Sequence, residues 1–95
     1  MELAQILTQL RQIQSRLARN YGVQSMSVFG STSRGTVNAE SDVDILVDID
    51  PSIALRFVDL AEELEAALGV KVDLVSRRAL KPRFLERIQN DLVHV

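Results

Sequence analysis

Residues 25–47, SMSVFGSTSRGTVNAESDVDILV, place two short apolar runs on either side of a turn-rich segment. The first run, residues 25–29, is typical of a short strand that ends at Gly30. The second run, residues 42–47, alternates in character from one residue to the next. One face carries Val43, Ile45 and Val47, and the other carries Asp42, Asp44 and Leu46. Because side chains alternate across a strand, this pattern predicts a strand with one apolar and one acidic face.

Helices are predicted on both sides of this pair of strands. Apolar residues at steps of three and four predict a helix over residues 2–19, which ends at Asn20-Tyr21-Gly22. A second helix is expected to start at Asp50-Pro51-Ser52 and to close at Gly69, because Pro suits the first helical position and Asp or Ser can cap the free amides. Its expected buried stripe consists of Leu55, Val58, Leu60, Ala61, Leu64, Ala67 and Leu68.

The remaining residues predict a third strand over residues 70–75, a short basic helix over 82–90 and a small edge strand over 92–95. The second and third strands are joined through a helix, which favours a parallel pair. The chain is therefore expected to form a single domain, residues 1–95, of the α/β (α+β) class. Its expected core is a small mixed sheet of three to four strands with helices packed against it.

Composition excludes several classes of protein. The net charge of −2 gives no overall basic field, and the few aromatic residues do not interleave with the basic ones, which argues against direct nucleic-acid binding. The sequence has no cysteine, so it offers neither disulfides nor thiolate ligands, and we expect a cytoplasmic protein. The N-terminal residues contain no unbroken apolar run, so neither a signal peptide nor a membrane span is expected there.

Acidic residues gather at the centre of the chain. Asp42 and Asp44 lie two residues apart on the predicted second strand, so both side chains point to the same face. Two carboxylates so close repel each other unless a cation lies between them, and Mg²⁺ prefers such oxygen ligands. Asp73, on the neighbouring predicted strand, could supply a third carboxylate. Asp42, Asp44 and Asp73 are therefore the candidate metal ligands.

The turn before this strand carries residues suited to phosphate. Gly30 permits a tight turn with close backbone approach, and Ser31 offers a hydroxyl and an amide at the start of a helical turn. Arg34 follows one turn later and can donate charge-assisted hydrogen bonds to the same anion. Phosphate donors facing a carboxylate pair suit metal-assisted phosphoryl or nucleotidyl transfer.

These residues carry a resemblance to a known family. Gly30-Ser31, ten intervening residues and then Asp42-Val43-Asp44 match the GS-x10-DxD pattern of the polymerase β-like nucleotidyltransferase superfamily. The wider context, "FGSTSRG" followed by "SDVDILV", resembles the minimal nucleotidyltransferases, small proteins that often act as antitoxins beside HEPN-domain toxins. The resemblance extends over nearly the whole chain.

The resemblance implies a site and a reaction. Asp42 and Asp44 would hold Mg²⁺, with two ions during catalysis, and Asp73 would be the third catalytic acid, acting as general base. Gly30 and Ser31 would hold the triphosphate of ATP with help from Arg34. The implied reaction transfers AMP from ATP to a tyrosine hydroxyl of a HEPN-type RNase toxin, and a hetero-oligomer with that toxin is implied as well.

Other interpretations of the same residues stay open at this stage. An isolated pair of aspartates is more often a solvated strand face, and Gly30 and Ser31 taken alone could be turn residues. The basic residues after Val70 are interpreted as solvated surface, and His94 as structural. The alternative function is a non-catalytic binding module that neutralises its partner by docking.

Overall fold

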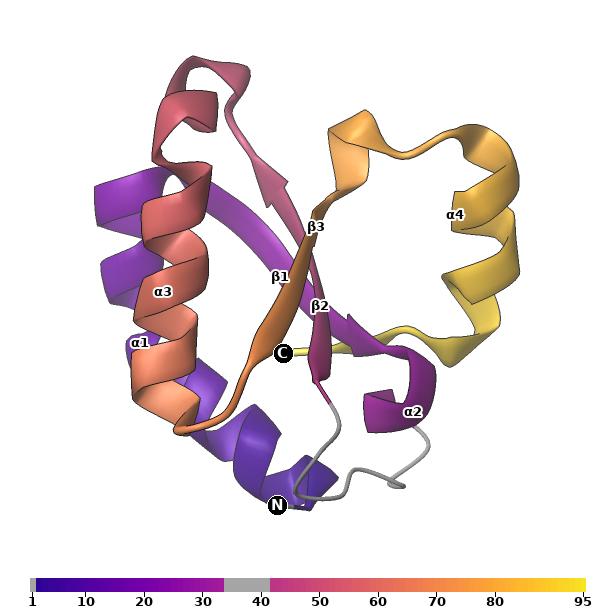
Figure 1. The fold of residues 1–95 in the computed structure, drawn as a ribbon, viewed down its shortest axis with the longest axis horizontal. Helices are drawn as coiled ribbons and strands as arrows, with labels where there is room; N and C mark the ends of the chain where they lie inside the picture. Colours follow the sequence, from indigo (N-terminus) through magenta and orange to yellow (C-terminus); the bar gives the residue numbers. More distant parts are fainter. Residues whose placement is uncertain (1, 34–41) are drawn as a thin grey trace.

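The computed structural model describes residues 2–33 and 42–95, and Figure 1 shows how the elements are arranged. Helices pack on both faces of a central sheet, with α1 and α3 on one side and α4 on the other. In chain order the elements are α1 (Leu3–Tyr21), β1 (Val23–Phe29), α2 (Gly30–Ser33), β2 (Val43–Ile49), η1 (Pro51–Arg56), α3 (Phe57–Leu68), β3 (Val72–Ser76), η2 (Arg77–Ala79), α4 (Pro82–Ile88), η3 (Gln89–Asp91) and β4 (Val93–His94), where η denotes a 3₁₀ helix.

The sheet has the strand order β3-β2-β1-β4. β1 pairs antiparallel with β2 and with β4, whereas β2 and β3 are parallel and are joined through η1 and α3. This mixed sheet confirms the predicted fold class, the parallel crossover and the small edge strand. Most predicted strand and helix boundaries differ from the observed ones by up to two residues, but the helix expected from residues 50–52 begins as an α-helix only at Phe57.

The N-terminal helix is fixed at both of its ends. The Glu2 amide donates to Gln5 Oε1 at 3.0 Å, as one half of a capping box. At the other end Gly22 adopts a left-handed conformation with φ of 65°, and its amide donates to Ala18 O at 3.0 Å. The chain therefore leaves α1 in a fixed direction and enters β1 after a single residue.

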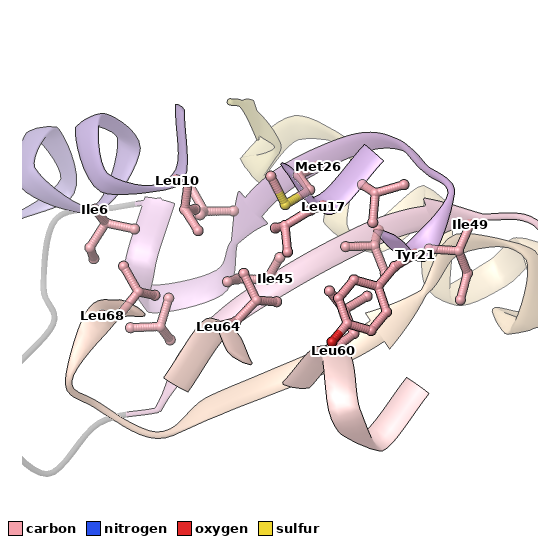
Figure 2. Close-up of a cluster of buried hydrophobic side chains, with 14 residues drawn as sticks. Ile6, Leu10, Leu17, Tyr21, Met26, Ile45, Ile49, Leu60, Leu64 and Leu68 are labelled. Atoms are coloured by element: carbon pink, nitrogen blue, oxygen red, sulfur yellow. The ribbon is translucent and has the colours of Figure 1, made fainter. Parts of the chain in front are cut away.

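The main core lies between the sheet and the pair α1 and α3. Figure 2 shows its side chains from both helices interlocking over the strands, with Ile45 of β2 at the centre of the cluster. Leu60, Leu64 and Leu68 recur at steps of four and bury one stripe of α3 against this cluster. A smaller cluster on the other face joins Phe29 and Leu46 to Ile88 of α4. Both faces of β2 are therefore covered over part of its length.

Two residues of the expected buried stripe lie in solvent instead. Leu55 is 98% exposed and Val58 is 65% exposed. For Leu55 the prediction was wrong because residues 51–56 form a 3₁₀ helix, which turns every three residues, so the periodicity of an α-helix does not extend back through this segment. Phe57–Leu68 alone forms α3, and Val58 lies in its first turn.

The end of α1 is tied to η1 through Tyr21 and Arg56. The Arg56 guanidinium lies 4.6 Å from the centre of the Tyr21 ring, and its Nη1 donates to Asn20 O at 2.8 Å. Burial raises the pKa of the Tyr21 hydroxyl, and the neighbouring Glu63 carboxylate raises this pKa further. The tyrosine therefore stays neutral in the folded protein at pH values where an unfolded chain begins to ionise it.

Among the described residues, none of the helices combines the length and the apolar character that crossing a bilayer requires.

The contrast between buried and exposed leucines gives a test of the fold. Leu64→Ala removes a side chain that is 0% exposed and should lower the free energy of unfolding by about 2–5 kcal/mol. Leu55→Ala, on the preceding 3₁₀ helix, should change it by less than about 0.5 kcal/mol. Urea denaturation measures both values. A large loss in Leu55→Ala would show that residues 51–56 pack inward as the sequence pattern had suggested.

The raised pKa of Tyr21 predicts a dependence of stability on alkaline pH. Because the folded pKa lies above the unfolded value, the unfolded chain loses its proton first, and stability falls as pH rises from about 10 through the folded pKa. Tyr21→Phe should lose less stability than the wild type between pH 8 and pH 11. Parallel loss in both proteins, measured by urea denaturation at each pH, would contradict this assignment.

Candidate functional site

The site is built around the end of β1, where the chain turns into α2. Gly30 has φ of 64°, a conformation that other residues rarely adopt. A Cβ atom built at this position would lie 2.5 Å from Asp44 Oδ2. The Ser33 hydroxyl donates to Gly30 O at 2.8 Å and closes the single turn of α2. The Asp44 carboxylate therefore lies close against the turn, and a side chain at position 30 would have to displace it.

Strand register brings a second carboxylate beside the first. Asp44 of β2 is the register partner of Asp73 on the parallel strand β3, and on its other side it is the partner of Phe29 at the end of β1. The Val43 amide also donates to Lys71 O at 2.9 Å, which fixes the start of this pairing. Asp44 and Asp73 therefore lie on adjacent strands, about 5 Å apart in backbone, and the glycine turn lies on the other side of Asp44.

The structure describes less of the other predicted site residues. Asp42 immediately precedes β2, is exposed and lies two residues from Asp44, on the same side of the chain. The backbone of Ser31 lies in α2, but its side chain is outside the described part of the structure, and Arg34 lies outside the described residues altogether. The structure thus brings together Gly30, Asp44 and Asp73 and leaves the contribution of Arg34 a prediction.

The carboxylates fit a magnesium ion by their chemistry. Asp42, Asp44 and Asp73 offer only oxygen donors, which Mg²⁺ prefers, and the Asp44 carboxylate lies close to the Gly30 turn. Within residues 2–33 and 42–95, however, no three His, Cys, Asp or Glu side chains are arranged closely enough to hold a metal. The three-aspartate metal site therefore stays a prediction.

The next acids along β2 have structural partners. Asp48 Oδ1 accepts from Arg78 Nε at 2.8 Å, and Asp50 Oδ1 accepts from the Ser52 amide at 2.9 Å. The Ser52 amide and then its hydroxyl lower the pKa of Asp50 below its ordinary value. These contacts connect the end of β2 to the 3₁₀ helices on either side of it. They account for both acids without a role in the site.

Two cavities lie away from the carboxylates. One of about 630 Å³ is apolar and lies at the opposite end of β2 and β3, between Ile49, Phe57 and Leu74. The other, of about 480 Å³, lies between α4 and the second face of the sheet, and its lining residues are Arg77, Leu85, Gln89, Leu92 and His94. Sequence reasoning missed both, because their residues come from separate elements and follow no shared periodicity.

The interpretation of His94 as structural agrees with its contact. Its Nδ1 lies 2.8 Å from the hydroxyl of Ser27, which is 3% exposed and belongs to β1. This hydrogen bond and the pairing of Val93 with Val28 connect β4 to β1. The edge strand is thereby held beside the strand that leads to Gly30.

Comparison with known proteins agrees with this geometry. The model of the nucleotidyltransferase domain matches residues 10–95. This chain belongs to the nucleotidyltransferase domain family. The resemblance seen in the GS-x10-DxD pattern is thus confirmed.

Relatives of this nucleotidyltransferase extend over its whole length. The protein adenylyltransferase MntA of Thermococcus cleftensis is 42% identical, over 99% of this chain and 93% of that protein. A solved structure assigned as a minimal nucleotidyltransferase is 33% identical with a TM-score of 0.86, over 100% of this chain and 97% of the other. A structure of a tri-AMPylated HEPN toxin from Shewanella oneidensis in complex with its MNT antitoxin also matches. The sequence identity is 25% and the TM-score is 0.69, over 94% of this chain and 70% of the other.

The Gly30 contact gives a prediction with a matched control in the same chain. Gly69 also has a positive φ, but nothing lies within 4 Å of a Cβ built there. Gly69→Ala and Gly30→Ala should each cost about 1–2 kcal/mol of folding free energy from backbone strain. Gly30→Ala alone should also displace the Asp44 carboxylate, because a flexible side chain moves more readily than the backbone.

Urea denaturation measures the two stabilities, and the NMR signal of the Asp44 carboxyl carbon reports its displacement. An unchanged Asp44 signal in Gly30→Ala would show that the turn and the carboxylate are not in contact in solution.

Proposed function

We propose that this protein is a magnesium-dependent protein adenylyltransferase that transfers AMP from ATP to a tyrosine hydroxyl of a HEPN-type RNase toxin. The observation that carries the proposal is the contact of the Gly30 turn with Asp44, beside Asp73, in a chain of the nucleotidyltransferase family. The AMPylated toxin bound to a relative supports the choice of acceptor protein, as does the name of the Thermococcus relative.

Each site residue has a role in binding the nucleotide. The turn at Gly30 would place backbone amides against the triphosphate, where a side chain at position 30 would be in the way. Ser31 and Arg34 would donate further hydrogen bonds to phosphate oxygens. Asp42, Asp44 and Asp73 would hold magnesium, which, when bound, neutralises charge on the phosphates and on the departing pyrophosphate.

The proposed reaction is a single displacement at the α-phosphorus of ATP. The tyrosine oxygen forms a bond to this phosphorus, the bond from it to the bridging oxygen of the β-phosphate breaks, and pyrophosphate leaves with the bonding electrons. The phenolic proton passes to the carboxylate of Asp73, the general base, which is exposed and lies next to Asp44. The products are an AMP-tyrosine phosphodiester and pyrophosphate, with no oxidation or reduction.

A second candidate function is a binding module that neutralises the toxin by docking alone. Exposed Leu55 and Val58 would suit the protein contact that this function needs. Either function requires a complex with the toxin, and we expect a hetero-oligomer in the cytoplasm. The two candidates differ in stoichiometry, because a catalyst acts on many toxin molecules and a docking protein on one.

Labelled ATP separates the two candidates. With Mg²⁺ and the toxin, the wild type should label the toxin and silence its RNase activity at substoichiometric amounts. The double substitution Asp42→Asn with Asp44→Asn should lower labelling at least about a hundredfold, because transition-state charge is no longer stabilised. Asp48→Asn, whose carboxylate is bound to Arg78, is the matched control and should label normally. Full labelling by the double variant would refute the assigned site.

A further inference from the structure

The cavity between α4 and the sheet lies on the same face as the candidate site. Asp44 and Leu46 are two residues apart on β2, so their side chains share a face, and Leu46 packs with Phe29 and Ile88. Leu85 and Leu92, which line the cavity, pack against this same cluster. The cavity therefore opens on the side of the sheet to which the Asp44 carboxylate points, opposite to the main core.

Strand register gives the distance between the cavity and the candidate site at Asp44. His94 is the register partner of Ser27, Ser27 is the partner of Leu46, and Leu46 lies two residues from Asp44. Two strand spacings across the sheet and two residues along it place the backbones of His94 and Asp44 roughly 12 Å apart. An extended nucleoside triphosphate spans such a distance, so a nucleotide with its phosphates at Gly30 can place its base in the cavity.

The lining of the cavity has the chemistry of a nucleobase site. Leu85 and Leu92 give an apolar floor for the face of a flat ring. Gln89 carries a carboxamide, whose paired donor and acceptor match the edge of adenine, and Arg77 has a planar guanidinium that can stack on a ring or contact ribose and phosphate. Ser27 is buried, and its hydroxyl forms a hydrogen bond with His94 that holds the imidazole ring in the wall of the cavity.

We propose that this cavity, lined by Arg77, Leu85, Gln89, Leu92 and His94, is the base subsite for the nucleotide and that Gln89 determines the preference for adenine. The inference rests on the proposed function, since it assigns the base of the same ATP molecule whose phosphates bind at the Gly30 turn. It gives the short C-terminal helix and β4 a role in substrate selection in addition to their role in packing.

Calorimetry with two ligands tests the subsite. In the presence of Mg²⁺, Gln89→Leu should weaken ATP binding about tenfold, because hydrogen bonds to the base are lost. The ratio of the affinity for ATP to the affinity for GTP should therefore become smaller. Binding of inorganic tripolyphosphate, which has no base, should be unchanged. Arg77→Met should likewise weaken ATP more than tripolyphosphate.

Two matched variants serve as controls. Asn90→Leu changes a neighbouring amide in η3 that does not line the cavity, and Arg83→Met removes an exposed arginine of α4 that does not line it either. Both should bind ATP as the wild type does.

Three results would overturn the subsite. The first is equal affinity for ATP in Gln89→Leu and the wild type. The second is a raised KM of Gln89→Leu for the toxin with unchanged affinity for ATP, which would assign the cavity to the acceptor instead. An equal loss of tripolyphosphate binding would show that the substitution acts on the phosphate site or the fold. By contrast, failure of the wild type to bind either ligand would overturn the proposed function together with its subsite, which distinguishes the two failures.

Discussion

The antiparallel pairing of β1 with β2 is the constraint on which the site depends. It places the end of β1 opposite Asp44, and at that point the chain must turn with a positive φ beside a carboxylate. Glycine suits the turn because of its positive φ, and any other residue at position 30 would also push the Asp44 carboxylate aside. The parallel strand β3 then adds Asp73 through register alone. Three candidate site positions are therefore brought together by the pairing of β2 with its two neighbouring strands.

The two faces of the sheet differ in how fully helices cover them. The face covered by α1 and α3 holds the larger core, including Ile45, Leu60 and Leu64, and gives the sheet its stability. The face covered by α4 is only partly apolar, because Leu46 on β2 is followed by Asp48 and preceded by Asp44. Burying Asp44 under a helix would desolvate its charge, which costs free energy. We therefore expect α4 to leave Asp44 uncovered. The open part of this face is where the candidate site lies.

The sequence predicted the elements wherever periodicity and chemistry agreed. The alternation over residues 42–47 predicted β2 and its two faces, and the parallel pairing followed from the helix between the second and third strands. The segment with Leu55 was predicted wrongly because a stripe of apolar residues cannot show that the first turns are 3₁₀. The positions of Gly30, Asp44 and Asp73 could be predicted from a motif and from the expected pairing of the second and third strands, and their roles stay predictions. The cavity with Gln89 and His94 could not, because it forms only when α4 folds back over β1.

The outer position of β4 makes one edge of β1 depend on residues far along the chain. β1 has its inner neighbour within about twenty residues, but its outer neighbour is sixty-seven residues away, where His94 meets Ser27, and the Val95 amide donates to Met26 O at 3.0 Å. While the chain is being synthesised, that edge of β1 stays unpaired until residues 93–95 emerge. An unpaired strand edge can pair with strands of other chains, so this edge of β1 is open to such pairing until residues 93–95 fold against it.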